Sequence, residues 1–303
     1  MTWIKLKQSY KQLCSKARNK ESFTEEWKTY SKIARSMESS PPTGLKTIQD
    51  LLTNLEKNIS RDKIKIFDHG CGSGFKSMYF AALGYKNIYG VNVNEDNEYL
   101  NEILKEIFKI DEKRFITTDG KIVPFQDKKF DFIISSQVVE HLTDDEVYLY
   151  YSEEGRILKK GGLAYHEVPH LFIPYESHSR IWFVHLFPYF LKPFFYGLFK
   201  SIEHKKNLFS KGGYYAKYYT GEFLRLRTPG FHKKMLLKFI GEYEDLTVSR
   251  LLKKSDFSSY DMDSPIGIRK IIHYIFMTPI IGKIFVLVLK NMFILQTLSK
   301  KDE

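Results

Sequence analysis

Residues 64–97 read IKIFDHGCGSGFKSMYFAALGYKNIYGVNVNEDN, and this stretch decides the fold of the chain. Apolar residues at positions 64, 66 and 67 form a run of strand length that ends at Asp68. A turn follows with glycine at positions 70, 72 and 74, where a missing side chain permits positive φ and lets a ligand approach the backbone. A helix is predicted from Phe75 to the stop signal Gly84, and a second strand over residues 88–93. The stretch therefore predicts one right-handed βαβ unit.

The spacing of the glycines separates two classes of nucleotide-binding turn. A dinucleotide fingerprint, G-x-G-x-x-G, would need glycine at position 75 or 77, where the chain has Phe75 and Ser77. This disfavours a nicotinamide-dependent oxidoreductase. The turn instead reads DHGCGSG from Asp68 to Gly74, which resembles motif I of the class I S-adenosylmethionine-dependent methyltransferases.

The resemblance continues in order over residues 60–170, about a third of the chain. The strand end GVNV at 90–93 is similar to the position where the family carries an acid for the ribose hydroxyls, but this chain has Asn92. An amide accepts at one end and donates at the other, so weaker binding is expected unless Glu95 or Asp96 compensates. The segments FITTDG at 115–120, QVVEHL at 137–142 and RILKKGGL at 156–163 resemble the family's adenine-binding, post-strand-four and pre-strand-five segments.

The resemblance implies S-adenosyl-L-methionine as the cofactor. The leading acid would help to hold the cofactor's amino group, and the glycine turn would back onto its methionine and ribose. The predicted cofactor-binding residues are Asp68, Gly70, Cys71, Gly72, Gly74, Asn92, Val93, Asp119, Gly120, Ser136 and Gln137.

Methyl transfer to a hydroxyl acceptor profits from a general base. The preferred candidate is His170 at the tip of the fifth strand, followed by His141 and Glu167. An alternative role for His141 is structural or substrate-facing. The side chain of His166 could instead face the core. No metal is predicted, because spacings of the C-x-x-C and H-E-x-x-H kind are absent.

Length and patterning predict an α/β protein with a Rossmann-like, doubly wound, mainly parallel seven-stranded sheet. The sheet would carry N-terminal helices and a helical, aromatic-rich C-terminal insertion and extension. The predicted regions are a helical cap (1–59), a cofactor-binding core (60–170), an acceptor-selecting insertion or lid (171–235), the end of the sheet (236–265) and an apolar, basic helical extension (266–303). Aromatic residues in the cap and in the insertion have two explanations, packing or ligand contact.

The charge and the cysteine content limit which partners and which cellular compartment are expected. Residues 1–170 carry 26 Lys and Arg against 25 Asp and Glu, whereas residues 171–303 carry 21 against 11. The basic second half indicates an anionic partner, or alternatively a solvated lysine-rich surface. Two distant cysteines, Cys14 and Cys71, fit a reducing cytosol, and the first 20 residues lack the apolar core of a signal peptide. A cytoplasmic protein is expected, with peripheral attachment to the inner membrane face as an extension of that prediction.

The segment 266–298 is apolar but is interrupted by Pro279, Lys283 and Lys290. Its longest uncharged run, residues 271–282, is shorter than the roughly 20 residues that a spanning helix needs. It is interpreted either as an interfacial helix toward an anionic membrane surface or as a buried C-terminal helix.

The predicted function is transfer of a methyl group from S-adenosylmethionine to a small-molecule, glycan-precursor or lipid-linked acceptor. The alternative is a catalytically inactive scaffold of the same fold at the membrane surface, motivated by Asn92 and the basic tail. Nucleic acid is not the expected partner, because no Asn/Asp-Pro-Pro-Tyr motif is present. The sequence does not indicate an oligomeric state.

Overall fold

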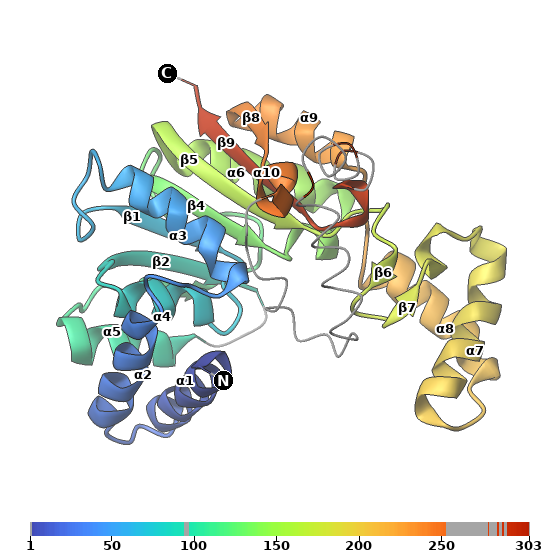
Figure 1. Cartoon of the computed structure of the whole chain (residues 1–303), viewed down its shortest axis with the longest axis horizontal. Helices are drawn as coiled ribbons and strands as arrows, with labels where there is room; N and C mark the ends of the chain where they lie inside the picture. Colours follow the sequence, from blue (N-terminus) through green and yellow to red (C-terminus); the bar gives the residue numbers. More distant parts are fainter. Residues whose placement is uncertain are drawn as a thin grey trace.

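The computed structural model describes residues 2–93, 97–252, 278, 284, 287 and 290–302. Its main sheet has seven strands in the order β3-β2-β1-β4-β5-β9-β8 (Figure 1). The first five in this order pair in parallel, and β9 is antiparallel to both of its neighbours. This confirms the predicted α/β class with a mainly parallel sheet. The strands are β1 (Lys65–His69), β2 (Asn87–Asn92), β3 (Phe115–Thr117), β4 (Phe130–Ser136), β5 (Leu158–Val168), β8 (Gly241–Asp245) and β9 (Leu295–Lys301).

Two apolar cores cover the two faces of this sheet. Ile66 and Ile134 belong to a core shared with α1–α5, whereas Phe67 and Ile133 belong to a core shared with α6 and α9. Successive side chains of a strand point to opposite faces, so adjacent residues serve different cores. This explains why the central strands read as continuous apolar runs. The helices are α1 (Thr2–Arg18), α2 (Thr24–Ser36), α3 (Thr43–Leu55), α4 (Phe75–Ala82), α5 (Glu98–Phe108), α6 (Asp144–Ile157) and α9 (Pro229–Phe239).

The first three helices occupy the predicted helical cap and pack on the α4–α5 side of the sheet (Figure 1). In α2, Trp27, Tyr30 and Ala34 are buried, as their spacing of three and four residues predicts. Tyr30 and Tyr79 are both fully buried, which shows that the cap and the core share one apolar interior.

The chain leaves the sheet after β5 and forms a separate lobe, yellow in Figure 1, that projects beyond the strand ends. We call residues 171–223 the insertion. Its own apolar core is small and consists of Ile181, Val184, Tyr196 and Ala216. Its elements are β6 (Tyr175–Glu176), β7 (Ile181–Trp182), η2 (Val184–Leu186), η3 (Tyr189–Leu191), α7 (Lys192–His204), η4 (Phe209–Lys211), α8 (Gly212–Lys217) and η5 (Tyr218–Glu222).

The predicted helical extension over residues 266–303 is wrong at its end, because Leu295–Lys301 form β9 inside the sheet. This strand pairs with β5 on one side and with β8 on the other, so its backbone N–H and C=O groups are hydrogen-bonded to both strands. The local sequence does not indicate this pairing. Most of the segment 266–298, which is expected to form an interfacial or a buried helix, lies outside the described residues. The short helix α10 (Thr247–Leu252) precedes that gap. None of the helices within the described ranges combines the length and the apolar composition that a membrane-spanning helix requires.

Candidate functional site

The glycine turn after β1 lies at the edge where the five parallel strands end, which we call the carboxyl edge. Gly70, Gly72 and Gly74 have φ values of 78°, 51° and 72°, in the left-handed region that favours glycine. A Cβ atom would lie 2.5 Å from Val138 Cγ2 at Gly70, and 2.5 Å from Leu100 Cδ1 at Gly74. At Gly72 it would meet nothing within 4 Å. The turn is therefore packed at its two ends and open at its centre.

Backbone hydrogen bonds hold this turn against β2. The N–H groups of Gly70 and Cys71 both donate to the Val91 carbonyl at 3.0 Å, and the Gly74 N–H donates to the Cys71 carbonyl at 2.8 Å. The turn is thus preorganised by the sheet itself, as a backbone cradle for a ligand requires.

Asp68 is buried, and its carboxylate accepts a 2.6 Å hydrogen bond from the Ser77 hydroxyl of α4. Burial raises the pKa of Asp68, and the Ser77 hydrogen bond opposes this effect. In this structure the side chain ties β1 to α4. Its predicted contact with the amino group of a cofactor stays a prediction.

The ends of β2 and β3 lie side by side beyond the turn. A Cβ atom on Gly120 would lie 2.9 Å from Val93 Cγ1, and Val93 is 49% exposed. Asp119 is exposed and accepts a 3.0 Å hydrogen bond from the Lys121 N–H. The Asn92 side-chain oxygen accepts from the Val93 N–H at 2.9 Å, so a ligand would meet Asn92 as a donor, through its NH2 group. Glu95 and Asp96, proposed to compensate for Asn92, lie outside the described residues.

The end of β4 carries a strained residue. Gln137 is exposed and has φ of 56°, and its N–H donates to the Glu167 carbonyl at 2.9 Å. Non-glycine residues in this region cost on the order of 1–3 kcal/mol and cluster at functional sites. Ser136, just before it, donates to Glu167 Oε1 at 3.5 Å.

Two tyrosines connect the helical cap to the glycine turn. The hydroxyls of Tyr10 in α1 and Tyr99 in α5 both donate to the Ser73 carbonyl, the latter at 2.8 Å. A cavity of about 450 Å³ opens beside them. Its lining includes Lys7, Lys11, Cys14, Arg18, Ser73 and Phe75. The cap therefore bounds a ligand-sized space at the turn.

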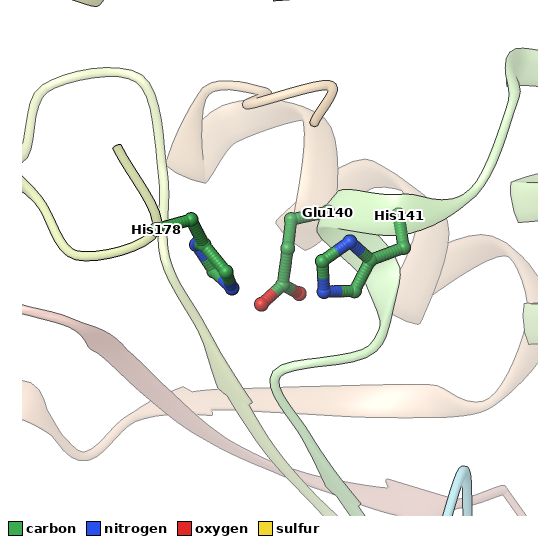
Figure 2. Close-up of side chains that lie close together, drawn as sticks. All are labelled: Glu140, His141 and His178. Carbon is green, nitrogen blue, oxygen red and sulfur yellow. The ribbon is translucent and has the colours of Figure 1, made fainter. Parts of the chain in front are cut away.

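A compact group of side chains follows β4, on the short turn η1 (Val139–His141). Glu140 is 1% exposed, and its carboxylate points between the rings of His141 and His178 (Figure 2). Burial raises the pKa of Glu140 to about 8. The two histidines reach Glu140 from different regions, because His178 belongs to the insertion.

The segment that directly follows the insertion is fastened to the same turn. The Arg225 N–H donates to the Glu140 carbonyl at 2.7 Å. The Arg227 guanidinium donates to the carbonyls of Val139 and Leu142 at 3.0 and 2.8 Å, and to Asp144 at 2.8 Å. The turn η1 is thus the place where the core and the insertion meet.

A family model described as "Methyltransferase domain" matches residues 67–166, from the middle of β1 to the end of β5. This third of the chain is similar to a methyltransferase domain. The match includes the glycine turn, the ends of β2, β3 and β4, and η1. The predicted family is confirmed on the region that carried the resemblance.

The curated relatives are ubiquinone biosynthesis O-methyltransferases. The protein of Bartonella tribocorum is 31% identical over 150 residues, which are 47% of this chain and 58% of the relative. That of Pelagibacter ubique is 28% identical over 149 residues, 46% of this chain and 58% of the relative. The chain therefore matches a little over half the length of each.

Solved structures similar to the chain include two with broad coverage. Geranyl diphosphate C-methyltransferase from Streptomyces coelicolor A3(2) is 13% identical, with a TM-score of 0.44 over 90% of this chain and 83% of that one. The YcgJ protein from Bacillus subtilis is 15% identical, with a TM-score of 0.42 over 83% and 98% of the two chains.

The residues at the carboxyl edge of the methyltransferase domain fit an adenosyl cofactor in most respects. The turn is open at Gly72, the apolar Val93 is half-exposed, and the carboxylate of Asp119 is exposed at the next strand end. Asn92 fits less well than an acid would, because its only acceptor oxygen is engaged by the backbone.

Two of the three candidate bases, His170 and Glu167, are engaged inside the protein. His170 is 1% exposed; its Nδ1 accepts from the Phe172 N–H at 3.2 Å and its Nε2 donates to the Phe293 carbonyl at 2.9 Å. Burial lowers its pKa to about 4. With both nitrogens engaged, His170 has none left to accept a proton, which argues against the preferred general base.

Glu167 and His166 are also engaged inside the protein. Glu167 Oε2 accepts from Gln296 at 2.8 Å and from Tyr165 at 3.2 Å. His166 is 1% exposed and contacts Glu154 at 2.7 Å, so it faces the core, as its alternative interpretation held. Of the three predicted catalytic residues, His141 alone belongs to the group around Glu140.

Sequence reasoning missed the pairing of Glu140 with His178 and the contact of Tyr10 with the turn. The EHL segment was a signal for Glu140 and His141, and His178 stood at the entry to the insertion. No local pattern could place the two segments against each other, since α6, β5 and β6 separate them in the sequence.

Proposed function

We propose that this protein transfers the methyl group of S-adenosylmethionine to an oxygen atom of a small acceptor. The observation that carries the proposal is the open glycine turn at the carboxyl edge of a matched methyltransferase domain. In open α/β sheets, ligands bind at this edge, where the strand order reverses between β1 and β4. An oxygen acceptor is supported by the curated relatives, which are named O-methyltransferases.

Four groups of residues would hold the cofactor. The backbone of Gly70–Gly72 would support its methionine and ribose portions, with the Asn92 NH2 group donating to a ribose hydroxyl. The exposed carboxylate of Asp119 would accept from the adenine amino group, and Gln137 would border the ring. When bound, the cofactor supplies an electrophilic methyl group on a sulfonium. The protein's main contribution is then to align the acceptor in line with that methyl group.

The insertion is the proposed wall of the acceptor site. It begins at the end of β5 and returns to η1 through Arg225 and Arg227, so it borders the same edge as the cofactor residues. Aromatic side chains are dense in it, and such side chains supply the apolar contact that small-molecule sites use.

Calorimetry of the full chain with S-adenosylmethionine and S-adenosylhomocysteine tests cofactor binding. We expect saturable binding of both. Asn92→Asp should tighten it about tenfold, because a carboxylate makes stronger, charge-assisted hydrogen bonds to the ribose. Asn58→Asp, an exposed position in the segment before β1, is the matched control and should leave binding unchanged. Absence of heat at millimolar ligand in both wild type and Asn92→Asp would favour the inactive scaffold, for which the engaged Asn92 oxygen is the supporting observation.

The acceptor atom is tested by S-adenosylhomocysteine release with matched hydroxyl and amine forms of small aromatic compounds. Turnover with hydroxyl compounds but not with the amines supports the proposal. The reverse preference would refute an oxygen acceptor and leave the cofactor proposal in place.

A further inference from the structure

The group formed by Glu140, His141 and His178 has the composition of a metal site. One ligand atom from each residue can be chosen so that all three lie within 4.8 Å of one another. Figure 2 shows the Glu140 carboxylate between the two imidazole rings. Within the described ranges, no other group of three potential metal ligands lies this close together.

Both histidines are oriented by a hydrogen bond from the ring nitrogen that would not bind the metal. His141 Nδ1 donates to the Phe223 carbonyl at 2.9 Å, and His178 Nδ1 donates to Glu176 Oε1 at 2.7 Å. Because these acceptors hold a proton on Nδ1, each Nε2 carries a lone pair. Metal-binding histidines almost always show this arrangement, with the second nitrogen donating to a carboxylate or a backbone carbonyl.

The Glu140 carboxylate is buried and lacks a hydrogen-bond partner among the described residues. Its side chain is 1% exposed, and neither carboxylate oxygen is hydrogen-bonded to another described residue. Its backbone is fixed, since its carbonyl accepts from the Arg225 N–H. Glu167 and Glu176 add negative charge nearby. A buried carboxylate needs compensation by hydrogen bonds, a cation or a metal, and a cation at this point would supply it.

We propose that Glu140, His141 and His178 bind a divalent transition-metal ion of the zinc class. Two imidazoles and one carboxylate are a common ligand set for zinc and other first-row metals, whereas magnesium and calcium prefer oxygen ligands alone. At metal–ligand distances of about 2.1 Å, neighbouring ligand atoms in a tetrahedral site lie about 3.4 Å apart, so small side-chain rotations close the site.

The metal would join two regions that the chain keeps separate. Glu140 and His141 lie on η1 of the core, whereas His178 and its partner Glu176 lie in the insertion. Three protein ligands leave a fourth position for water or an acceptor oxygen. Sequence spacing could not predict the site, because its ligands lie on different elements.

The test is titration of the chelator-treated chain, residues 1–303, with Zn²⁺ by calorimetry and with Co²⁺ by visible absorption. We expect one ion per chain, and for Co²⁺ a d–d spectrum of nitrogen and oxygen ligands. Glu140→Gln keeps the shape of the side chain, and His178→Ala removes a ligand from the insertion. Each should weaken binding by more than about 100-fold, because even residues that only orient the ligands contribute about 10–100-fold.

Two further variants complete the series. Glu176→Gln should weaken binding about 10–100-fold through the orientation of His178, a graded effect that nonspecific binding would not show. His204→Ala, a half-exposed histidine at the end of α7, is the control and should bind like wild type. The proposal is overturned if Zn²⁺ fails to bind wild type, or if Glu140→Gln and His178→Ala bind as wild type does.

This inference does not depend on the proposed methyl transfer. Calorimetry with S-adenosylhomocysteine on metal-free protein reports on the glycine turn alone, so the two proposals can fail separately.

Discussion

The core and the insertion both contain many apolar and aromatic residues, yet the two regions bury them very differently. In the core, Phe67, Ile133 and Ile134 are fully buried between two layers of helices. In the insertion, Tyr189, Phe190 and Phe194 are 62%, 77% and 55% exposed. The core organises itself by burying both faces of a sheet. The insertion has only a small core of its own, so its position relative to the core depends on the attachment to η1.

The largest effect is expected from breaking a buried ionic contact within the core. Glu154 is 0% exposed and lies between His69 at 3.0 Å and His166 at 2.7 Å. Glu154→Ala leaves these groups without their partner, and should lower the free energy of unfolding by about 3–5 kcal/mol. Chemical denaturation measures this. Glu25→Ala removes an exposed partner of Lys28 and should cost less than about 1 kcal/mol; equal losses in the two variants would contradict the prediction.

The same contact predicts a pH dependence. Burial opposes ionisation of Glu154, but the adjacent His166 and His69 outweigh it and lower its pKa to about 2, from a usual value of about 4.5. A lowered folded-state pKa adds stability above the unfolded-state pKa, and this stability is lost as the pH falls from about 4.5 to about 2. Denaturation curves across that window should show a steeper loss in wild type than in Glu154→Ala. Parallel curves would show that Glu154 does not titrate there.

Paired glycine substitutions compare the two regions directly. Gly70→Ala in the core places a Cβ 2.5 Å from Val138 at positive φ, and should cost about 2–3 kcal/mol. Gly213→Ala in α8 of the insertion meets nothing within 4 Å, and should stabilise by about 0.4–1 kcal/mol. Thermal unfolding of both variants checks the opposite signs. Gly70→Ala should also lose cofactor binding, whereas Gly213→Ala should retain it.

Loosening the attachment should affect the insertion more than the core. Arg227 donates to Val139, Leu142 and Asp144 around η1. Arg227→Ala should cost about 1.5–3 kcal/mol, because charged hydrogen bonds to buried carbonyls are lost. Limited proteolysis should then cleave within residues 171–223 at least several-fold faster, with the core fragment surviving. Arg180→Ala, which removes a largely exposed guanidinium within the insertion, is the control. Uniform cleavage throughout the chain would refute a separately attached lobe.

The smallest effect is expected at the exposed aromatic surface. Phe190→Ser removes a side chain that is 77% exposed, so the free energy of unfolding should change by less than about 0.5 kcal/mol. Denaturation measures it, and a loss above 1 kcal/mol would show that Phe190 packs inside the protein.

The amino-acid sequence by itself determined the βαβ unit, the sheet class and the site of the glycine turn. These follow from short-range patterns: short, continuous apolar runs along β1 and β2, and glycines where a tight turn requires positive φ. The same order of elements also predicted that Asn92, Asp119 and Gln137 lie at one edge of the sheet. Each stands at or just after the end of a parallel strand, and the carboxyl ends of parallel strands share one edge.

Only the tertiary structure decided which distant segments meet. It placed Leu295–Lys301 beside β5 as a strand, with Gln296 hydrogen-bonded to Glu167, where local composition favoured a helix. In the folded chain both nitrogens of His170 form hydrogen bonds, and His178 lies beside Glu140 (Figure 2). Local periodicity constrains a residue only relative to its neighbours in sequence. Pairing across many residues depends on backbone hydrogen bonds and burial in the whole fold, and these exist only once the chain has closed on itself.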